Sequence, residues 1–231
     1  MKIYITGGGE SENYRDLDKH FLANFGKNNN LLLLPMANDQ EDFEDCLERI
    51  EATYQDLGHK GAVELLEDLT QFSLNQLANY PAIYIDGGNT FTLIEQIRNN
   101  SFIDCLKKYS QNGGIIHADS AGGIILGAHV KTAFIGEDSD DNQEKTQNFS
   151  GTGLLKDWAI HCHYDPHEDE LLQDIVYESG LPILALSEYT GVYIEDHELS
   201  VFGQQDLSVL NMMGKKLIPV GTKIALDLLL E

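Results

Sequence analysis

The chain has 231 residues and a formal net charge of −23 at pH 7, from 38 acidic and 15 basic residues. This charge excludes nucleic acid and anionic membrane surfaces as partners, because their phosphates would repel the protein. The N-terminus lacks a long apolar signal region, no stretch has the length of a transmembrane helix, and the three cysteines lack metal-motif spacing. These features predict a cytoplasmic protein. In the absence of a Pro/Ser-rich linker, residues 1–231 are expected to form a single domain.

Strand-like and helix-like runs alternate along the first half of the chain. Strands are predicted at residues 2–6, 31–34, 61–66, 82–85 and 115–116, and helices at residues 13–25, 43–57 and 91–98. Residues 31–34 are four consecutive leucines, which is typical of a strand covered on both faces. The alternation therefore predicts an α/β fold, with a parallel sheet that carries helices on both faces.

The pattern changes after residue 128. Residues 136–151 are polar and acidic and are predicted to form a loop. Beyond it, we expect a strand at 158–161, an acidic helix at 168–179, strands at 181–186, 191–195 and 199–202, and edge strands at 207–212 and 223–230. The strands at 191–195 and 199–202 are predicted to form a hairpin.

Three Gly-rich turns follow predicted strands, at residues 7–9, 86–89 and 118–123. Sites in parallel α/β sheets form at the carboxyl ends of the strands, so these turns are candidates for a site. The turn at 7–9 lacks the third glycine of a dinucleotide fingerprint, and a nucleotide site is not expected there.

Ser120 lies where a buried strand is expected to turn sharply into a helix. A nucleophile elbow has this form, usually as Gly-x-Ser-x-Gly, and Ala118 replaces the first glycine here. In such a turn the backbone N–H of Ala121 can point at a developing oxyanion. The alternative interpretation is that Ser120 caps a helix after a buried strand.

A nucleophilic serine needs a base, usually histidine, and a group that orients the base. His161, His163 and His167 cluster after a short apolar run that can end at the same sheet edge as Ser120. Any one carboxylate of the acidic loop 137–141 could orient such a histidine. The histidine cluster also permits a metal site, and with it a metal-dependent hydrolase.

Several motifs in chain order resemble one family, the serine peptidases of dipeptidase E (aspartyl dipeptidase) and cyanophycinase. The motifs are Ile3-Tyr4-Ile5-Thr6-Gly7-Gly8-Gly9, Asp86-Gly87-Gly88-Asn89-Thr90, Asp119-Ser120-Ala121-Gly122, and Gly151-Thr152-Gly153-Leu154-Leu155 followed by His163-Tyr164. The resemblance covers residues 1 to about 200. It implies a three-layer α/β/α sandwich around a mostly parallel sheet, similar to class I glutamine amidotransferase domains.

The resemblance also implies the site residues of a serine peptidase or dipeptidase that acts on small peptides without a cofactor or metal. The implied residues are Ser120 as nucleophile, His163 as base, Asp138 as orienting acid with Glu137 as the next choice, Gly88 and Ala121 as oxyanion donors, and Asn89 in substrate binding.

The chain departs from the family pattern after the expected base. Aspartyl dipeptidases resemble one another in an arginine that follows the catalytic histidine, whereas this chain has no arginine after Arg98. A substrate carboxylate would meet the acidic residues 168–170 instead of a bidentate clamp. We therefore expect no preference for N-terminal aspartate. The alternative function is that of a binding domain that has the same fold but has lost catalytic turnover. Whether the chain forms a homodimer is left open by the sequence.

Overall fold

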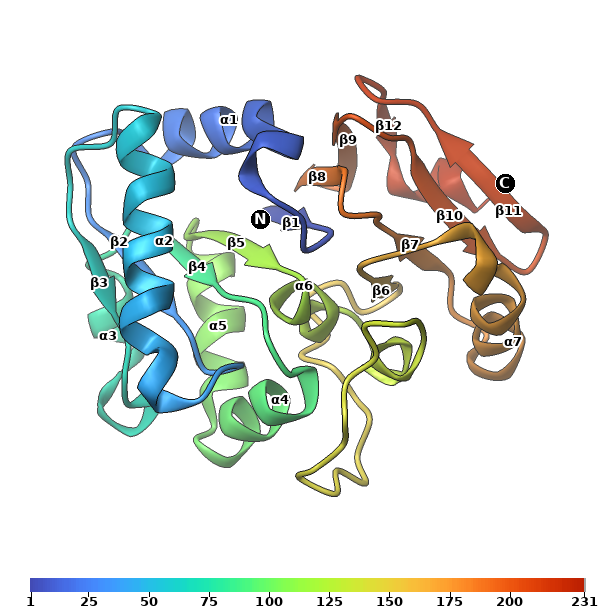
Figure 1. Ribbon diagram of the computed structural model, residues 1–231, viewed down its shortest axis with the longest axis horizontal. Coiled ribbons are helices and arrows are strands. Elements are labelled where there is room, and N and C mark those ends of the chain that lie inside the picture. The colour runs from blue at the N-terminus through green and yellow to red at the C-terminus, as the bar shows by residue number, and fades with distance from the viewer. Residues whose placement is uncertain (231) are drawn as a thin grey trace.

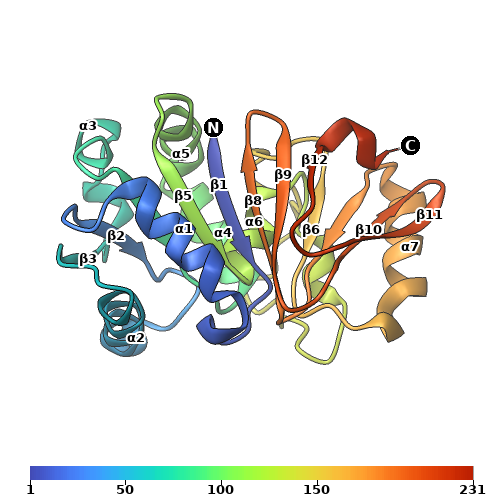
Figure 2. The same cartoon turned by 90° about the horizontal axis from the view of Figure 1, so that it is seen from above.

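A mixed eight-stranded sheet forms the centre of the molecule, in a computed structural model that describes residues 1–230 except for the side chain of residue 71. Its strand order is β12-β9-β8-β1-β5-β4-β2-β3 (Figures 1 and 2). The strands are β1 (Lys2–Thr6), β2 (Leu31–Leu34), β3 (Val63–Leu65), β4 (Ala82–Ile85), β5 (Ile115–Asp119), β8 (Thr190–Glu195), β9 (Glu198–Gly203) and β12 (Lys223–Ala225). The pairings among β1, β5, β4, β2 and β3 are parallel, which confirms the predicted α/β sheet.

Helices cover both faces of the parallel part of this sheet. The α-helices are α1 (Arg15–Phe25), α2 (Phe43–Asp56), α3 (Leu74–Leu77), α4 (Thr90–Asn99), α5 (Phe102–Gln111), α6 (Ala121–Leu126) and α7 (Asp169–Ser179). The short 3-10 helices are η1 (Ser11–Tyr14), η2 (Gln40–Asp42), η3 (Leu69–Gln71), η4 (Lys131–Phe134), η5 (Pro166–Glu168) and η6 (Leu226–Leu229). Helices α1 and α2 pack on one face, and α3 to α6 on the other (Figure 2).

The two-residue period of the strands explains how both faces are filled. On β1, the side chain of Tyr4 packs with α1, whereas Ile3 and Ile5 belong to the core on the opposite face. All four leucines of β2 are fully buried because Leu32 and Leu34 point into the core on one face of the sheet and Leu31 and Leu33 into the core on the other. The sequence thus correctly identified β2 as covered on both faces.

The second half of the chain adds antiparallel strands and a second sheet. β8 pairs antiparallel with β1 and with β9, and β9 pairs with β12. The four-stranded second sheet has the order β11-β10-β7-β6 and consists of β6 (Ala159–His161), β7 (Ile183–Ala185), β10 (Leu207–Asn211) and β11 (Gly214–Ile218). Residues 207–212 are therefore not an edge strand of the main sheet, because β10 lies between β7 and β11. Helix α7 packs on this second sheet, at the opposite end of the molecule from α2 (Figure 1).

One continuous apolar core joins the two sheets. Val192 and Leu199 of the main sheet and Leu184 and Val209 of the second sheet belong to the same buried cluster. No helix within residues 1–230 is both long and apolar enough to cross a membrane.

The three Gly-rich turns lie together at one edge of the main sheet. They follow β1, β4 and β5, which are neighbours in the strand order and run parallel. The loop after β6 also lies at this edge of the sheet. The backbone N–H of His163 in this loop donates to Gly7 O at 2.9 Å. The fold thus builds a common site from segments that are far apart in the chain.

Candidate active site

Ser120 occupies a strained turn between β5 and α6. Its backbone angles are φ 46° and ψ −113°, a combination that costs a non-glycine residue on the order of 1–3 kcal/mol. The turn is held at both ends: Ser120 N–H donates to Thr6 O, and Ile124 N–H donates to Ser120 O. Two residues after Ser120, position 122 requires glycine, because a Cβ there would lie 2.5 Å from Ile85 O. The strain and the supporting contacts are those expected where a reactive side chain is presented.

Ala118 is compatible with this turn. It is fully buried on β5, where it pairs with Ile5 of β1 and Ile85 of β4. A methyl group is accommodated at this position, so the departure from Gly-x-Ser-x-Gly leaves the sharp turn intact.

The side chains of Ser120 and His163 are in direct contact. Ser120 Oγ lies 2.8 Å from His163 Nε2. His163 follows β6 with a positive φ of 55°, and its ring packs against the first Gly-rich turn, where a Cβ on Gly8 would lie 2.2 Å from His163 Cε1. The turn at residues 7–9 thus has a clear role in the site: its glycines allow the backbone to lie against the imidazole.

Neither of the other two histidines of the cluster bonds Ser120 in the described part of the chain, although His161 lines the smaller of two cavities beside Ser120. His161 is buried and its Nε2 lies 2.8 Å from Glu168 Oε2, whereas the side chain of His167 is 99% exposed. β6 ends at His161, so His163 lies just beyond the strand. The predicted three-histidine metal cluster does not form among the described residues.

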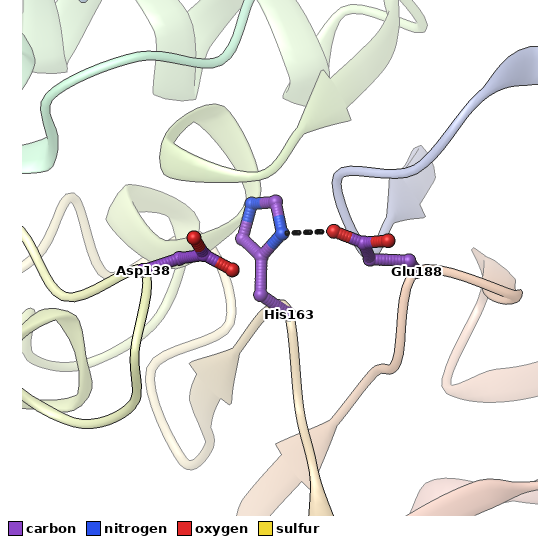
Figure 3. Close-up of side chains that lie close together, drawn as sticks. All are labelled: Asp138, His163 and Glu188. Atoms are coloured by element: carbon purple, nitrogen blue, oxygen red, sulfur yellow. Dashed lines mark hydrogen bonds and ion pairs between the residues drawn. The ribbon is translucent and has the colours of Figure 1, made fainter.

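A carboxylate lies at the other nitrogen of the His163 ring, and it belongs to Glu188. Glu188 Oε1 is 3.1 Å from His163 Nδ1 (Figure 3). Glu188 lies in the loop between β7 and β8, and this loop runs beside the first Gly-rich turn, because a Cβ on Gly9 would lie 2.0 Å from Glu188 O. Glu188 was not predicted, because the acid was expected between Ser120 and His163 in the chain.

Asp138 lies on the other side of the same imidazole (Figure 3). One carboxylate oxygen of Asp138, one oxygen of Glu188 and one ring nitrogen of His163 all lie within 4.8 Å of one another. Glu137 is exposed in the same loop as Asp138. The role of Asp138 or Glu137 as orienting acid stays a prediction, but the observed hydrogen bond favours Glu188.

Backbone N–H groups flank Ser120 on two sides. Ala121 is the first residue of α6, so its N–H has no acceptor within the helix. Gly88 has φ 131°, and a Cβ there would lie 2.5 Å from Ala37 O, which keeps the turn tight beside Ser120. The role of these two N–H groups as oxyanion donors stays a prediction.

Asn89 has a structural task in the same turn. Its Oδ1 accepts from the N–H groups of Phe91 and Thr92 at the start of α4, and its Nδ2 donates to Asp141 O. The amide therefore fixes the second Gly-rich turn to the acidic loop. The predicted contact of Asn89 with substrate stays a prediction.

Two cavities open on either side of Ser120. The smaller, about 300 Å³, is lined by Gly88, Ser120 and His163 together with residues of the acidic loop and η4. Asp140 in this cavity accepts from Thr90 N–H at 2.9 Å, and burial raises the pKa of its carboxyl. The larger cavity, about 860 Å³, shares the same three residues and extends toward α1 and α2.

Two of the acidic residues that stand where the arginine was expected are paired, and Glu168 also lines the smaller cavity. Glu168 bonds His161, and Asp169 accepts from Lys215 Nζ at 2.9 Å. Among the described residues that line the smaller cavity, none is a lysine or an arginine. The larger cavity is lined by Arg15 and Arg49, and the expected lack of a preference for N-terminal aspartate stays a prediction.

Comparisons with known proteins show similarity to peptidases. Residues 3–202 match the model of peptidase family S51. The chain is 24% identical over 200 residues to a protein of Nostoc sp. named Peptidase E, covering 82% of this chain and 78% of that protein. It is 26% identical over 143 residues to a Drosophila melanogaster protein described as a probable alpha-aspartyl dipeptidase, covering 58% of each.

Two solved structures share the fold. A peptidase from an acI-B1 Actinobacterium superposes with a TM-score of 0.74 at 18% identity, over 97% of this chain and 96% of the other. A Listeria monocytogenes EGD-e protein described as a candidate peptidase E gives a TM-score of 0.69 at 21% identity, over 88% and 98% of the two chains.

Proposed function

The chain belongs to peptidase family S51 and is a serine-type peptidase, and on that basis we propose that it hydrolyses small peptides with Ser120 as the nucleophile. The observation that carries the proposal is the chain of contacts from Ser120 Oγ to His163 Nε2 at 2.8 Å and from His163 Nδ1 to Glu188 Oε1 at 3.1 Å. Serine, histidine and carboxylate in this order form the hydrogen-bonded arrangement that activates a hydroxyl for attack on an acyl carbon.

Each residue has a distinct task in this mechanism. Ser120 Oγ attacks the peptide carbonyl while His163 Nε2 accepts its proton and then returns it to the leaving amine. The carboxylate of Glu188 accepts the hydrogen bond of Nδ1–H, which fixes the tautomer that leaves Nε2 free to accept a proton. Water then attacks the acyl-enzyme by the same route and releases the second product.

The oxyanion of the tetrahedral intermediate is stabilised by the backbone N–H groups of Gly88 and Ala121. Each such donor contributes most when charge develops on the oxygen, and loss of one donor costs roughly 10²–10³ in kcat in enzymes of this type. The mechanism uses no metal or cofactor.

A fluorophosphonate probe tests the nucleophile directly. The wild-type protein is expected to be labelled on the peptide that contains Ser120, and Ser120→Ala to be unlabelled and to have lost dipeptide hydrolysis. Ser139→Ala, a substitution in the exposed acidic loop, serves as the matched control and should retain both. Hydrolysis that survives in Ser120→Ala would refute the mechanism, and a wild-type protein that neither reacts nor hydrolyses would favour a binding domain without turnover.

A further inference from the structure

The larger cavity beside Ser120 has an unusual charge. It lies between α1, α2 and the edge of the main sheet, and Ser120, Gly88 and His163 form one end of it. Eight carboxylates and only two guanidinium groups line it. The carboxylates belong to Glu10, Glu12, Asp18, Asp42, Asp45, Asp56, Asp86 and Asp119. A cleft that is lined mainly by one sign of charge and bounded by low-dielectric protein concentrates the potential inside it, so this cavity attracts cations.

The two arginines already have partners. Arg49 Nη2 lies 2.5 Å from Asp86 Oδ1, and Arg15 donates to Asp56. Neither is therefore a free anion-binding group. The remaining carboxylates give the cavity a strong negative excess, so a substrate carboxylate is disfavoured there.

Three of the carboxylates are buried, and one of them is incompletely bonded. Asp18, Asp86 and Asp119 are 2%, 1% and 9% exposed. Asp86 Oδ2 is buried and has no hydrogen-bond partner within the described part of the chain. The thiol of Cys46 lies near it, and burial first and the charge of Asp86 second raise the pKa of that thiol to about 12. A thiol is a weak donor, so it does not replace a full hydrogen bond.

The carboxylate next to the nucleophile belongs to the same group. Asp119 precedes Ser120, and a Cβ on Gly87 would lie 3.2 Å from Ser120 Cβ and 3.4 Å from Asp119 Oδ2. Asp119 Oδ1 accepts from Thr6 Oγ1 at 2.5 Å, but burial still raises the pKa of this carboxyl, with the charge of Asp86 adding to the effect. Buried carboxylates of this kind are stabilised by a cation that enters the cavity.

From this arrangement we propose that the larger cavity binds the positively charged side chain of a lysine or arginine residue next to the scissile bond. The proposal rests on the proposed function, because it takes Ser120 as the point of attack. At about 860 Å³ the cavity lies within the range of small-molecule sites, which is about 300–1,000 Å³. The substrates would thus be short basic peptides.

Matched peptides that differ only in charge test the proposal. We would measure kcat/KM for Lys-Leu against norleucine-Leu, and for Leu-Lys against Leu-norleucine, since norleucine keeps the aliphatic chain and lacks the ammonium group. One lysine peptide is expected to exceed its partner by about ten- to a hundredfold, the range of a hydrogen bond to a charged group. Ratios near one in both pairs would overturn the proposal.

A pair of double variants assigns the effect to the cavity. Asp42→Asn with Asp45→Asn removes two exposed carboxylates of the cavity wall and should reduce the lysine-to-norleucine ratio by about two- to tenfold. Glu44→Gln with Glu48→Gln changes the same segment and the same charge outside the cavity lining, and should leave the ratio unchanged. Equal effects of the two double variants would show that the preference comes from net charge and would refute the cavity site.

Binding to Ser120→Ala separates this proposal from the proposed function. Calorimetry with the lysine and norleucine peptides measures recognition without turnover. Tighter binding of the lysine peptide supports the cation site even if the wild-type protein hydrolyses neither peptide, a result that would refute the proposed function alone. Hydrolysis that depends on Ser120, combined with equal binding of both peptides, would refute the cation site alone.

Discussion

Substitution of Glu188 by glutamine tests which acid orients His163. The variant removes the negative charge but keeps an oxygen that can accept from Nδ1–H, and the side chain of Glu188 is 48% exposed, so the fold should be unaffected. The imidazolium formed during catalysis and the carboxylate have a separation of about 4 Å between charge centres, for which the attraction is about 1 kcal/mol in bulk water and about 4 kcal/mol at an effective dielectric constant of 20.

These two interaction energies set the range of the expected loss in kcat. A charge-stabilisation term of about 1–4 kcal/mol corresponds to roughly five- to a thousandfold in kcat. Because Glu188 is half exposed, water screens the pair, and we expect a value in the lower half of that range. A fully buried orienting aspartate, by comparison, is worth about 10⁴.

The assay is dipeptide hydrolysis at saturating substrate, with thermal unfolding measured in parallel. Asp138→Asn is the competing variant, because Asp138 lies on the opposite side of the ring without a hydrogen bond to it. Glu188→Gln should lower kcat more than Asp138→Asn does, with an unchanged Tm. A larger loss in Asp138→Asn would refute the assignment of Glu188 and restore the acid that the sequence predicted.

Three further substitutions test other parts of the structure. Gly8→Ala places a Cβ 2.2 Å from His163 Cε1 at φ 93°, so it should displace the imidazole and lower kcat/KM by about a hundredfold, as measured with the dipeptide substrate. Phe91→Ala removes a fully buried ring that packs on Phe134 and should lower the free energy of unfolding by about 3–5 kcal/mol in denaturant titrations; a loss below 1 kcal/mol would contradict the packing. The folded-state pKa of Asp119 is raised, so its ionised form destabilises the fold at neutral pH, and this penalty disappears as the pH falls through the raised pKa toward the unfolded value near 4. Asp119→Asn should therefore raise Tm at pH 7 and lose this advantage at lower pH, and an equal Tm difference at all pH values would refute the titration of Asp119.

The sequence by itself determined the parallel half of the fold and the turn between β5 and α6 that holds Ser120. Local patterns were sufficient there: apolar runs predicted buried strands, and small residues after β1, β4 and β5 marked turns that parallel pairing brings to one edge. Helix α5 was missed, although Phe102, Leu106 and Tyr109 have helical spacing and are buried. The contact of His163 with Ser120 followed the family resemblance, because a motif next to Tyr164 selected one histidine of three.

Only the tertiary structure revealed the contact of Glu188 with His163, the second sheet and the charge of the larger cavity. Glu188 bonds His163 because the β7–β8 loop packs against residues 7–9, a contact between segments that no local pattern connects. The pairing of the strands after residue 158 depends on which apolar faces meet, so the sequence could not divide them between two sheets. The cavity's carboxylates come from α1, α2, β5 and several loops, and their charges act together only because folding surrounds one space with them.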